Sequence, residues 1–158
     1  MVPEGVEREA MKQKWAVESL RGLPVKRHMT AKVIAVRPNT SLWKAWNLLR
    51  THDIGYLPVV QGKRVVGMIS DGDLRQLLPS SLAMPEEHER FRTWGTQVRV
   101  GDVMTRKVVT VATGTRTGNA AQLMVRHRIG CMPVLRGSAL VGIITTRDLL
   151  RLWPSFIP

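Results

Sequence analysis

The stretch Ile129–Leu150 reads IGCMPVLRGSALVGIITTRDLL, an apolar run that ends in the polar cluster Thr145-Thr146-Arg147-Asp148. A stretch of the same pattern, IGYLPVVQGKRVVGMISDGDLR, occupies Ile54–Arg75. Residue 54 aligns with residue 129, and the same offset of 75 positions also aligns Met29-Thr30 with Met104-Thr105, without a gap. A repeat of this kind indicates two copies of one supersecondary unit. We expect two such small units to pack face to face.

Each copy predicts the order strand–helix–strand–strand–helix and hence an α/β fold. An extended run at 33–36 or 108–111 is followed by a helix with apolar residues three and four positions apart. Two short strands, 57–60 and 65–69 or 132–135 and 140–144, flank a glycine-containing turn. The last helix is expected to start at Asp71 or Thr146.

The repeat divides the chain into four parts. Residues 1–24 form a helical or flexible N-terminal segment, 25–78 the first copy, 79–99 a connector and 100–158 the second copy. Prolines, serines and acidic residues mark the connector, and we expect its Phe91 and Trp94 to tuck into the body.

Composition restricts the class of protein. The 44% hydrophobic content of 158 residues supports a packed core, and the single cysteine, Cys131, excludes an internal disulfide or a cysteine-based zinc site. No apolar run approaches the roughly 20 residues that span a bilayer, and the first twenty residues do not resemble a secretory signal. We therefore expect a cytoplasmic protein with no membrane partner.

The net charge of +12 is unevenly placed, because residues 103–158 hold eight Lys or Arg against one acid, Asp148. A strong positive field concentrates anions, whether a phosphate-bearing small molecule, a nucleic acid or an acidic protein. Composition does not choose among these partners.

The polar cluster that ends Ile129–Leu150 suggests a ligand-binding site. Thr145 closes a strand and opens a helix, where unpaired backbone N–H groups favour phosphate. The Asp148 carboxylate, three residues on, can accept from both hydroxyls of a ribose. The same spacing is also close to a helix capping box, and both interpretations can hold together.

Two copies carrying the patterns MT…V…V, IGxxPV and VGIITTRDL resemble the paired cystathionine-beta-synthase (CBS) domain, or Bateman module, over roughly residues 25–153. The resemblance implies a pseudo-twofold pair with two clefts for adenosine-containing ligands such as AMP, ADP, ATP or S-adenosylmethionine. It also implies a homodimer formed by association of two such pairs.

By the same resemblance, each cleft takes its ribose-binding Asp from one copy and its base pocket from the other. The favoured cleft would combine Thr145, Arg147 and Asp148 with Thr30, Val33, Ala35, Tyr56, Leu57 and Pro58. The opposite cleft would combine Ser70 and Asp73 with Thr105, Val108, Thr110, Cys131, Met132 and Pro133.

The two clefts are expected to differ. Asp71 adds a negative charge beside Ser70, whereas the second copy has Thr146 there, followed by Arg147. Arg147 can make forked contacts to phosphate oxygens, although a merely solvated charge is an equal alternative.

No residue set points to catalysis. Cys131 is expected to be a buried hydrophobe, and the chain has no Ser-His-Asp set, phosphate-loop consensus or paired catalytic carboxylates. We predict a non-enzymatic regulatory protein that senses an adenosine nucleotide, requires no other cofactor and signals to an unidentified effector protein. The alternatives are a basic nucleic-acid-binding protein and a purely structural dimerisation module.

Overall fold

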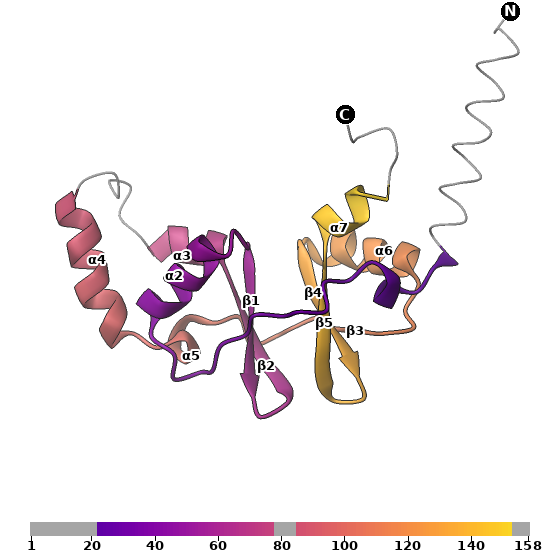
Figure 1. Cartoon of the computed structure of the whole chain (residues 1–158), viewed down its shortest axis with the longest axis horizontal. Helices are drawn as coiled ribbons and strands as arrows, with labels where there is room; N and C mark the ends of the chain where they lie inside the picture. The colour runs from indigo at the N-terminus through magenta and orange to yellow at the C-terminus, as the bar shows by residue number, and fades with distance from the viewer. Residues whose placement is uncertain (1–21, 78–84, 153–158) are drawn as a thin grey trace, which may run out of the picture. The chain divides into compact units, whose positions relative to one another are not determined.

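The computed structural model describes residues 22–77 and 85–152 (Figure 1). They form two compact units of matching architecture. The copy-1 unit contains residues 33–77, 85–109 and 138–140, and the copy-2 unit contains residues 22–32, 110–137 and 141–152. Most of the predicted N-terminal segment, residues 1–21, lies outside the described residues.

The copy-1 unit is an antiparallel hairpin with helices packed on it. Its elements are α2 (Leu42–Thr51), β1 (Tyr56–Gln61), β2 (Arg64–Ser70), α3 (Asp71–Leu77), α4 (Pro85–Gln97) and α5 (Val100–Val103). Strand β1 pairs with β2 in a register that places Tyr56 opposite Ser70. The connecting turn has Gly62 at φ 64°, a left-handed conformation that glycine adopts without a Cβ penalty.

The copy-2 unit repeats this plan. Its elements are the 3₁₀ helix η1 (Val25–Arg27), β3 (Val111–Ala112), α6 (Thr117–His127), β4 (Cys131–Arg136), β5 (Ala139–Thr145) and α7 (Thr146–Leu150). The first two residues of β5 are grouped with the copy-1 unit. The strand order is β3-β4-β5, with β3 parallel to β4. Gly137 in the β4–β5 turn has φ 60°, matching Gly62 in the first copy. The predicted α/β class and the helix–strand–strand–helix order of each copy are thus confirmed.

Apolar periodicity explains why these helices form and where they pack. Leu42, Ala45, Trp46 and Leu49 make one face of α2, and all four are buried. They join Leu57, Val59 and Ile69 of the hairpin in one core cluster. Full burial of each large aliphatic side chain contributes about 1.5–3 kcal/mol. Ser41 caps the helix by accepting from the Lys44 N–H at 3.3 Å.

Each unit is completed by the segment that leads into the other copy. Residues 22–32 include the start of the first copy but belong to the copy-2 unit, where Thr30 and Ile143 exchange two backbone hydrogen bonds of 2.9 and 3.0 Å. Residues 100–109 are the start of the second copy but belong to the copy-1 unit, where Thr105 and Met68 exchange two backbone hydrogen bonds of 2.9 Å. The exchange is reciprocal, so neither unit is contiguous in sequence.

A methionine of each leading segment packs on a glycine of β2 or β5. A Cβ added at Gly142 would lie 3.0 Å from Met29 Cγ, and one at Gly67 would lie 2.9 Å from Met104 Cγ. The methionine sulfur would be closer still in both cases, at a separation that real Cβ atoms essentially never show. The two glycines therefore leave room for the exchanged segments.

The predicted first strand of each copy is shorter than expected. Residues 33–36 contribute only an isolated bridge between Val36 and Val59, and 108–111 overlaps β3 only at Val111. The physical reason is proline in the neighbouring strand. Pro58 and Pro133 have no N–H to donate. The parallel pairing therefore does not extend to the residues that precede Val36 and Val111.

The predicted connector contains a helix, α4, which was missed. Pro85 at its first position and Glu86-Glu87 in its first turn are typical of a helix start, although the same residues also occur in loops. Phe91 is buried at 3% exposure and packs edge-on against Trp43 and Trp46, each at 5.7 Å between centroids. Burial of Phe91 was predicted correctly. Trp94 is 42% exposed, so its predicted burial was wrong.

We predict that Gly142→Ala destabilises the chain by about 1–3 kcal/mol, because the added methyl overpacks against Met29. Met29→Ala should remove most of this penalty. Urea unfolding of the two single variants and the double variant measures the coupling. Additive losses would show that the two side chains do not meet.

Candidate functional site

The strand-to-helix junction of the copy-2 unit holds a hydroxyl and a carboxylate together. Thr145 ends β5 and caps α7. Its Oγ1 donates to Asp148 Oδ2 at 2.7 Å, its backbone N–H donates to the same oxygen at 2.8 Å, and the Asp148 N–H donates back to Oγ1 at 3.2 Å. Both side chains are half-buried. This arrangement is the capping box that the sequence had left as one of two interpretations.

The copy-1 unit reproduces the geometry to within 0.1 Å. Ser70 Oγ and the Ser70 N–H donate to Asp73 Oδ2 at 2.7 and 2.8 Å, and the Asp73 N–H donates to Ser70 Oγ at 3.1 Å. In both copies one carboxylate oxygen accepts two hydrogen bonds. The Oδ1 atoms of Asp73 and Asp148 accept none within residues 22–77 and 85–152. Each Asp therefore keeps acceptor capacity for a ligand hydroxyl.

Two of the other predicted site residues lie beside these pairs in their units. Thr30 bonds to Ile143, two residues before Thr145 on β5, and its side chain is exposed. Thr105 bonds to Met68, two residues before Ser70 on β2, and is also exposed. The exchange of leading segments is what brings these threonines to the junctions.

The remaining predicted residues are split between the units. Val33, Ala35, Val108 and 56–58 belong to the copy-1 unit, and Thr110 and 131–133 to the copy-2 unit. The hairpin register places Tyr56 beside Ser70 of its own copy. The assignment of Tyr56, Leu57 and Pro58 to Asp148, and of Cys131, Met132 and Pro133 to Asp73, stays a prediction.

The apolar residues predicted to line the two clefts are more buried than the polar site residues. Leu57, Pro58, Met132 and Pro133 are fully buried. At the start of the same strands, Tyr56 is half-buried and Cys131 is 7% exposed. The sequence pattern identified these positions as apolar but did not indicate how deeply each is buried.

The surroundings of the two carboxylates differ in charge. Asp71, next to Ser70, pairs with Arg75 at 2.7 Å, and its side chain is still 32% exposed. In the second copy, Thr146 replaces Asp71 and is followed by Arg147, which is exposed and has no ion-pair partner in the described part of the chain. The copy-2 junction therefore carries the less negative environment of the two.

Cys131 is an inert neighbour of the copy-2 junction. Burial, reinforced by the negative charge of Asp148, raises the pKa of the Cys131 thiol to about 12. The thiol is neutral near pH 7, and the thiolate is the nucleophilic form. The prediction of a buried cysteine is confirmed.

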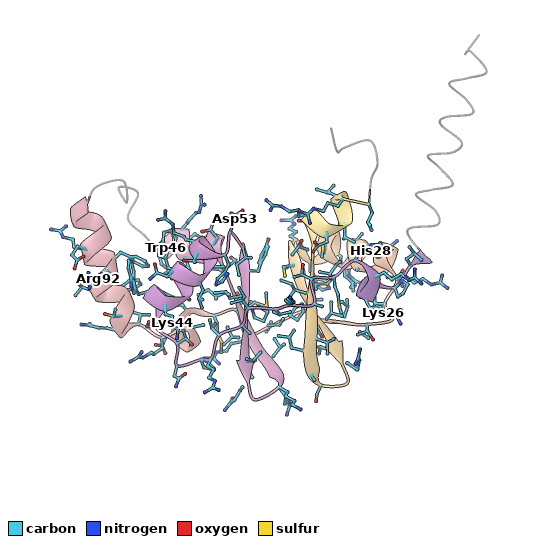
Figure 2. All side chains as sticks on the ribbon, viewed as in Figure 1. Lys26, His28, Lys44, Trp46, Asp53 and Arg92 are labelled. Carbon is cyan, nitrogen blue, oxygen red and sulfur yellow. The ribbon has the colours of Figure 1, made fainter. Side chains whose placement is uncertain are left out.

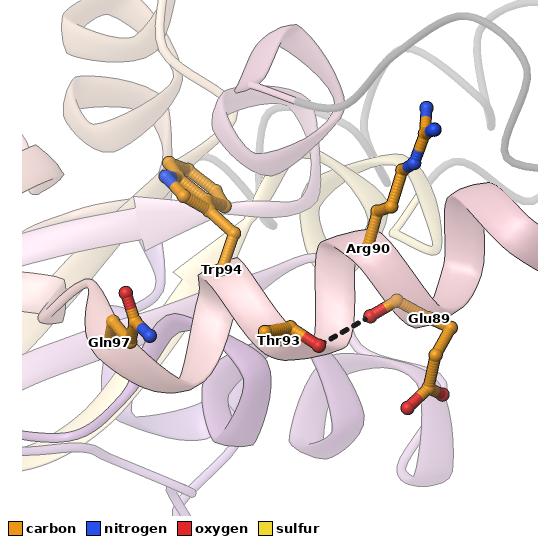
Figure 3. A pocket seen from close by; sticks show the side chains of 5 residues that line it. All are labelled: Glu89, Arg90, Thr93, Trp94 and Gln97. Carbon is orange, nitrogen blue, oxygen red and sulfur yellow. Dashed lines mark hydrogen bonds between the residues drawn. The ribbon is translucent and has the colours of Figure 1, made fainter.

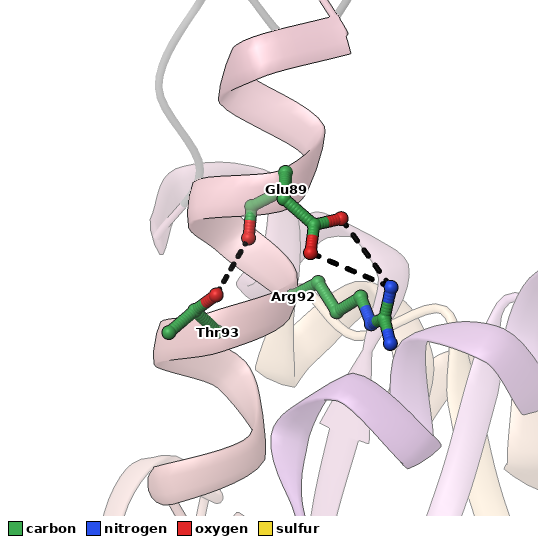
Figure 4. Close-up of polar contacts among 3 residues, drawn as sticks. All are labelled: Glu89, Arg92 and Thr93. Carbon is green, nitrogen blue, oxygen red and sulfur yellow. Dashed lines mark hydrogen bonds and ion pairs between the residues drawn. The ribbon is translucent and has the colours of Figure 1, made fainter.

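One hollow was not anticipated from the sequence. A volume of about 570 Å³ lies along one face of α4 and is lined by Glu89, Arg90, Thr93, Trp94 and Gln97 (Figure 3). Thr93 Oγ1 donates to the Glu89 carbonyl at 3.0 Å, and both carboxylate oxygens of Glu89 lie 3.4 Å from Arg92 Nη1 (Figure 4). All of these residues come from a single helix, so the hollow is open.

Neither a metal cluster nor a membrane span is found in the described ranges. Among residues 22–77 and 85–152, no three His, Cys, Asp or Glu side chains gather as metal ligands would. No helix in the same ranges is long and apolar enough to cross a bilayer.

A duplicated α/β unit with a hydroxyl–carboxylate pair at each strand-to-helix junction defines the class of this protein. The family model for the CBS domain matches residues 25–80 and again residues 100–155. The chain belongs to the CBS-domain family as a tandem pair.

Solved structures of CBS-domain proteins match almost the whole chain. The CBS domain of a CBS domain-containing membrane protein from Sphaerobacter thermophilus is 33% identical, with a TM-score of 0.77 over 92% of this chain and 96% of that one. The plan of two copies is therefore shared along nearly the full length.

Two further matches are complexes with adenosine-containing ligands. CBSX2 in complex with AMP is 30% identical, with a TM-score of 0.65 over 82% of this chain and 95% of that one. The CBS domain pair of protein MJ0100, in complex with 5-methylthioadenosine and S-adenosyl-L-methionine, is 26% identical, with a TM-score of 0.68 over 84% and 96%.

Thr145→Ala removes the oxygen that caps α7 and one donor to Asp148, so we expect a loss of about 0.5–2 kcal/mol in the free energy of unfolding. Urea denaturation measures it. The exposed neighbour Thr146 is the matched control, and Thr146→Ala should change stability by less than about 0.5 kcal/mol. Equal losses at both positions would contradict the capping role.

We expect native Cys131 to react with iodoacetamide far more slowly than the unfolded chain at pH 8. The reason is that a raised pKa keeps the thiol protonated until the pH approaches about 12. Mass spectrometry of alkylated protein, with and without urea, gives the ratio. Similar rates in both states would show that the thiol is accessible.

Proposed function

We propose that this protein is a regulatory sensor of an adenosine-containing ligand and that Asp148 accepts hydrogen bonds from the ribose hydroxyls. The observation that carries the proposal is the geometry of the carboxylate. Oδ2 is fixed by Thr145, while Oδ1 has no partner among the described residues. The AMP complex of CBSX2 and the methylthioadenosine and S-adenosylmethionine complex of MJ0100 support the ligand class.

Charge favours the copy-2 junction as the stronger site for a phosphorylated ligand. Asp71 beside Ser70 repels phosphate, and its partner Arg75 is 72% exposed and only partly offsets it. Thr146 and Arg147 replace this repulsion with a neutral side chain and a cation. AMP, ADP and ATP are the expected ligands. S-adenosylmethionine, which carries a sulfonium cation and an amino-acid tail in place of phosphate, is the alternative, and no other cofactor is proposed.

A sensor must bind its ligand better in one arrangement of the protein than in another. We propose a homodimer as the responding assembly and an effector protein as its target. Two large apolar side chains of the copy-2 helices are candidates for the dimer contact, since Val125 on α6 is 80% exposed and Leu150 on α7 is 58% exposed.

Isothermal titration calorimetry with AMP, ADP, ATP and S-adenosylmethionine tests the proposal. We expect at least one to bind at submillimolar Kd, and Asp148→Asn to weaken that binding at least tenfold, because an amide presents one acceptor where the carboxylate presents two.

Asp73→Asn is the matched control, since its hydrogen bonds are the same as those of Asp148. It should leave the stronger site intact. If no ligand binds at millimolar concentration, or if none shifts the melting temperature, the chain is a structural module and the sensor proposal fails.

A further inference from the structure

The excess positive charge of the chain is concentrated on the copy-2 unit. Its described residues include a single acid, Asp148, whose carboxylate is engaged with Thr145. Against it stand nine cations, all exposed: Lys26, Arg27, Lys32, Arg116, Arg126, Arg128, Arg136, Arg147 and Arg151. None of the nine has an ion-pair partner within the described ranges.

The copy-1 unit has a different charge balance. It holds eleven Lys or Arg (37, 44, 50, 63, 64, 75, 90, 92, 99, 106, 107) against seven acids (53, 71, 73, 86, 87, 89, 102). Two of its arginines form ion pairs, Arg75 with Asp71 and Arg92 with Glu89. Residues 1–21 carry four acids and four Lys or Arg, so they add no net charge to the copy-2 unit.

Three of the nine cations are held together by the leading segment. The Val25 N–H donates to the Thr115 carbonyl at 2.8 Å, and the Thr117 N–H donates to the Leu23 carbonyl at 2.9 Å. These bonds place Lys26 and Arg27 of η1 beside Arg116, which precedes α6. We call Lys26, Arg27 and Arg116 the basic edge. Figure 2 shows Lys26 projecting from η1.

The charge of the basic edge is specific to this copy. At the aligned positions of the copy-1 unit, Lys26 becomes Gly101, Arg27 becomes Asp102 and Arg116 becomes Ser41. Ser41 caps α2, whereas Arg116 makes no side-chain cap of α6. The second copy thus lacks a stabilising cap and has a cation in its place.

The neighbours of the basic edge fit phosphodiester better than a protein or a membrane. The Lys26 N–H donates to the Thr113 carbonyl at 3.3 Å, and Gly114 and Asn119 are exposed within three residues of Arg116 in sequence. Hydroxyl, backbone N–H and amide groups such as these are common donors to nucleic-acid phosphates. A protein interface or an inserted membrane surface needs exposed apolar side chains as well. Val125, the large exposed apolar residue of α6, lies in the last turns of that helix, away from Arg116.

We propose that the basic edge binds the phosphate backbone of nucleic acid, RNA or DNA, without reading its sequence. The interaction is distinct from the adenosine site, because it uses none of the residues of the hydroxyl–carboxylate pairs. The copy-2 unit would then present one surface to a polymer and a separate junction to a small ligand.

Fluorescence anisotropy with labelled 20-nucleotide RNA and single-stranded DNA tests the proposal at 50 and 200 mM KCl. The basic-edge variant combines Lys26→Gln, Arg27→Gln and Arg116→Ser. The matched control, Lys63→Gln, Arg64→Gln and Lys107→Gln, removes the same formal charge from exposed positions of the copy-1 unit. The basic-edge variant should weaken binding to both polymers at least tenfold. The slope of log K against log salt concentration should become shallower by about two, because three phosphate contacts are lost. The control should change affinity less than threefold.

Arg116→Ser alone separates binding from folding. The new serine should cap α6 as Ser41 caps α2, so the melting temperature should rise while affinity falls. Three results would overturn the proposal: equal losses in the two triple variants, no binding at 50 µM protein in 50 mM KCl, or tighter binding to phosphatidylserine vesicles than to RNA. Calorimetry with the adenosine ligands should be unchanged in the basic-edge variant.

Discussion

The packing of one methionine on one glycine, made twice, is the constraint on which both units depend. Met29 lies on Gly142 and Met104 lies on Gly67, and the adjacent threonines bond to β5 and β2. This contact carries Thr30 and Thr105 to the two junctions where the carboxylates stand. A side chain at either glycine would press on the methionine that packs there, in the segment that also carries the threonine beside the candidate site.

The sequence predicted the parts of the fold that local chemistry determines. The apolar runs, the glycine turns and the polar ends of the two long stretches were sufficient to locate β1, β2, β4 and β5 to within one residue at each end. It did not predict that residues 22–32 belong to the unit of the second copy, because such exchange depends on contacts between residues more than eighty positions apart. Helix α4 was missed because Pro85 followed by two glutamates is also a common sequence in loops.

The candidate site, too, was predictable from the sequence only where it depends on neighbouring residues. The spacing of Thr145 and Asp148 indicated either a capping box or a ligand grip, and the structure contains the first without removing the second. Charge counting from the sequence found the excess in residues 103–158, yet it could not join Lys26 and Arg27 to Arg116. That grouping requires the hydrogen bonds between Val25 and Thr115, and between Thr117 and Leu23.

The exchange of leading segments also bears on how such a protein can arise and be divided. In the pair, the methionine at the start of each copy packs on the glycine of the other copy, Met29 on Gly142 and Met104 on Gly67. A protein with a single copy would have to make the same exchange with a second identical molecule. The extent of that exchange would depend on protein concentration. Fusing two copies makes the exchange intramolecular, and each copy then meets the other at an effective concentration on the order of millimolar. Cutting the chain between the copies should consequently leave two fragments that fold together when mixed, and poorly when kept apart.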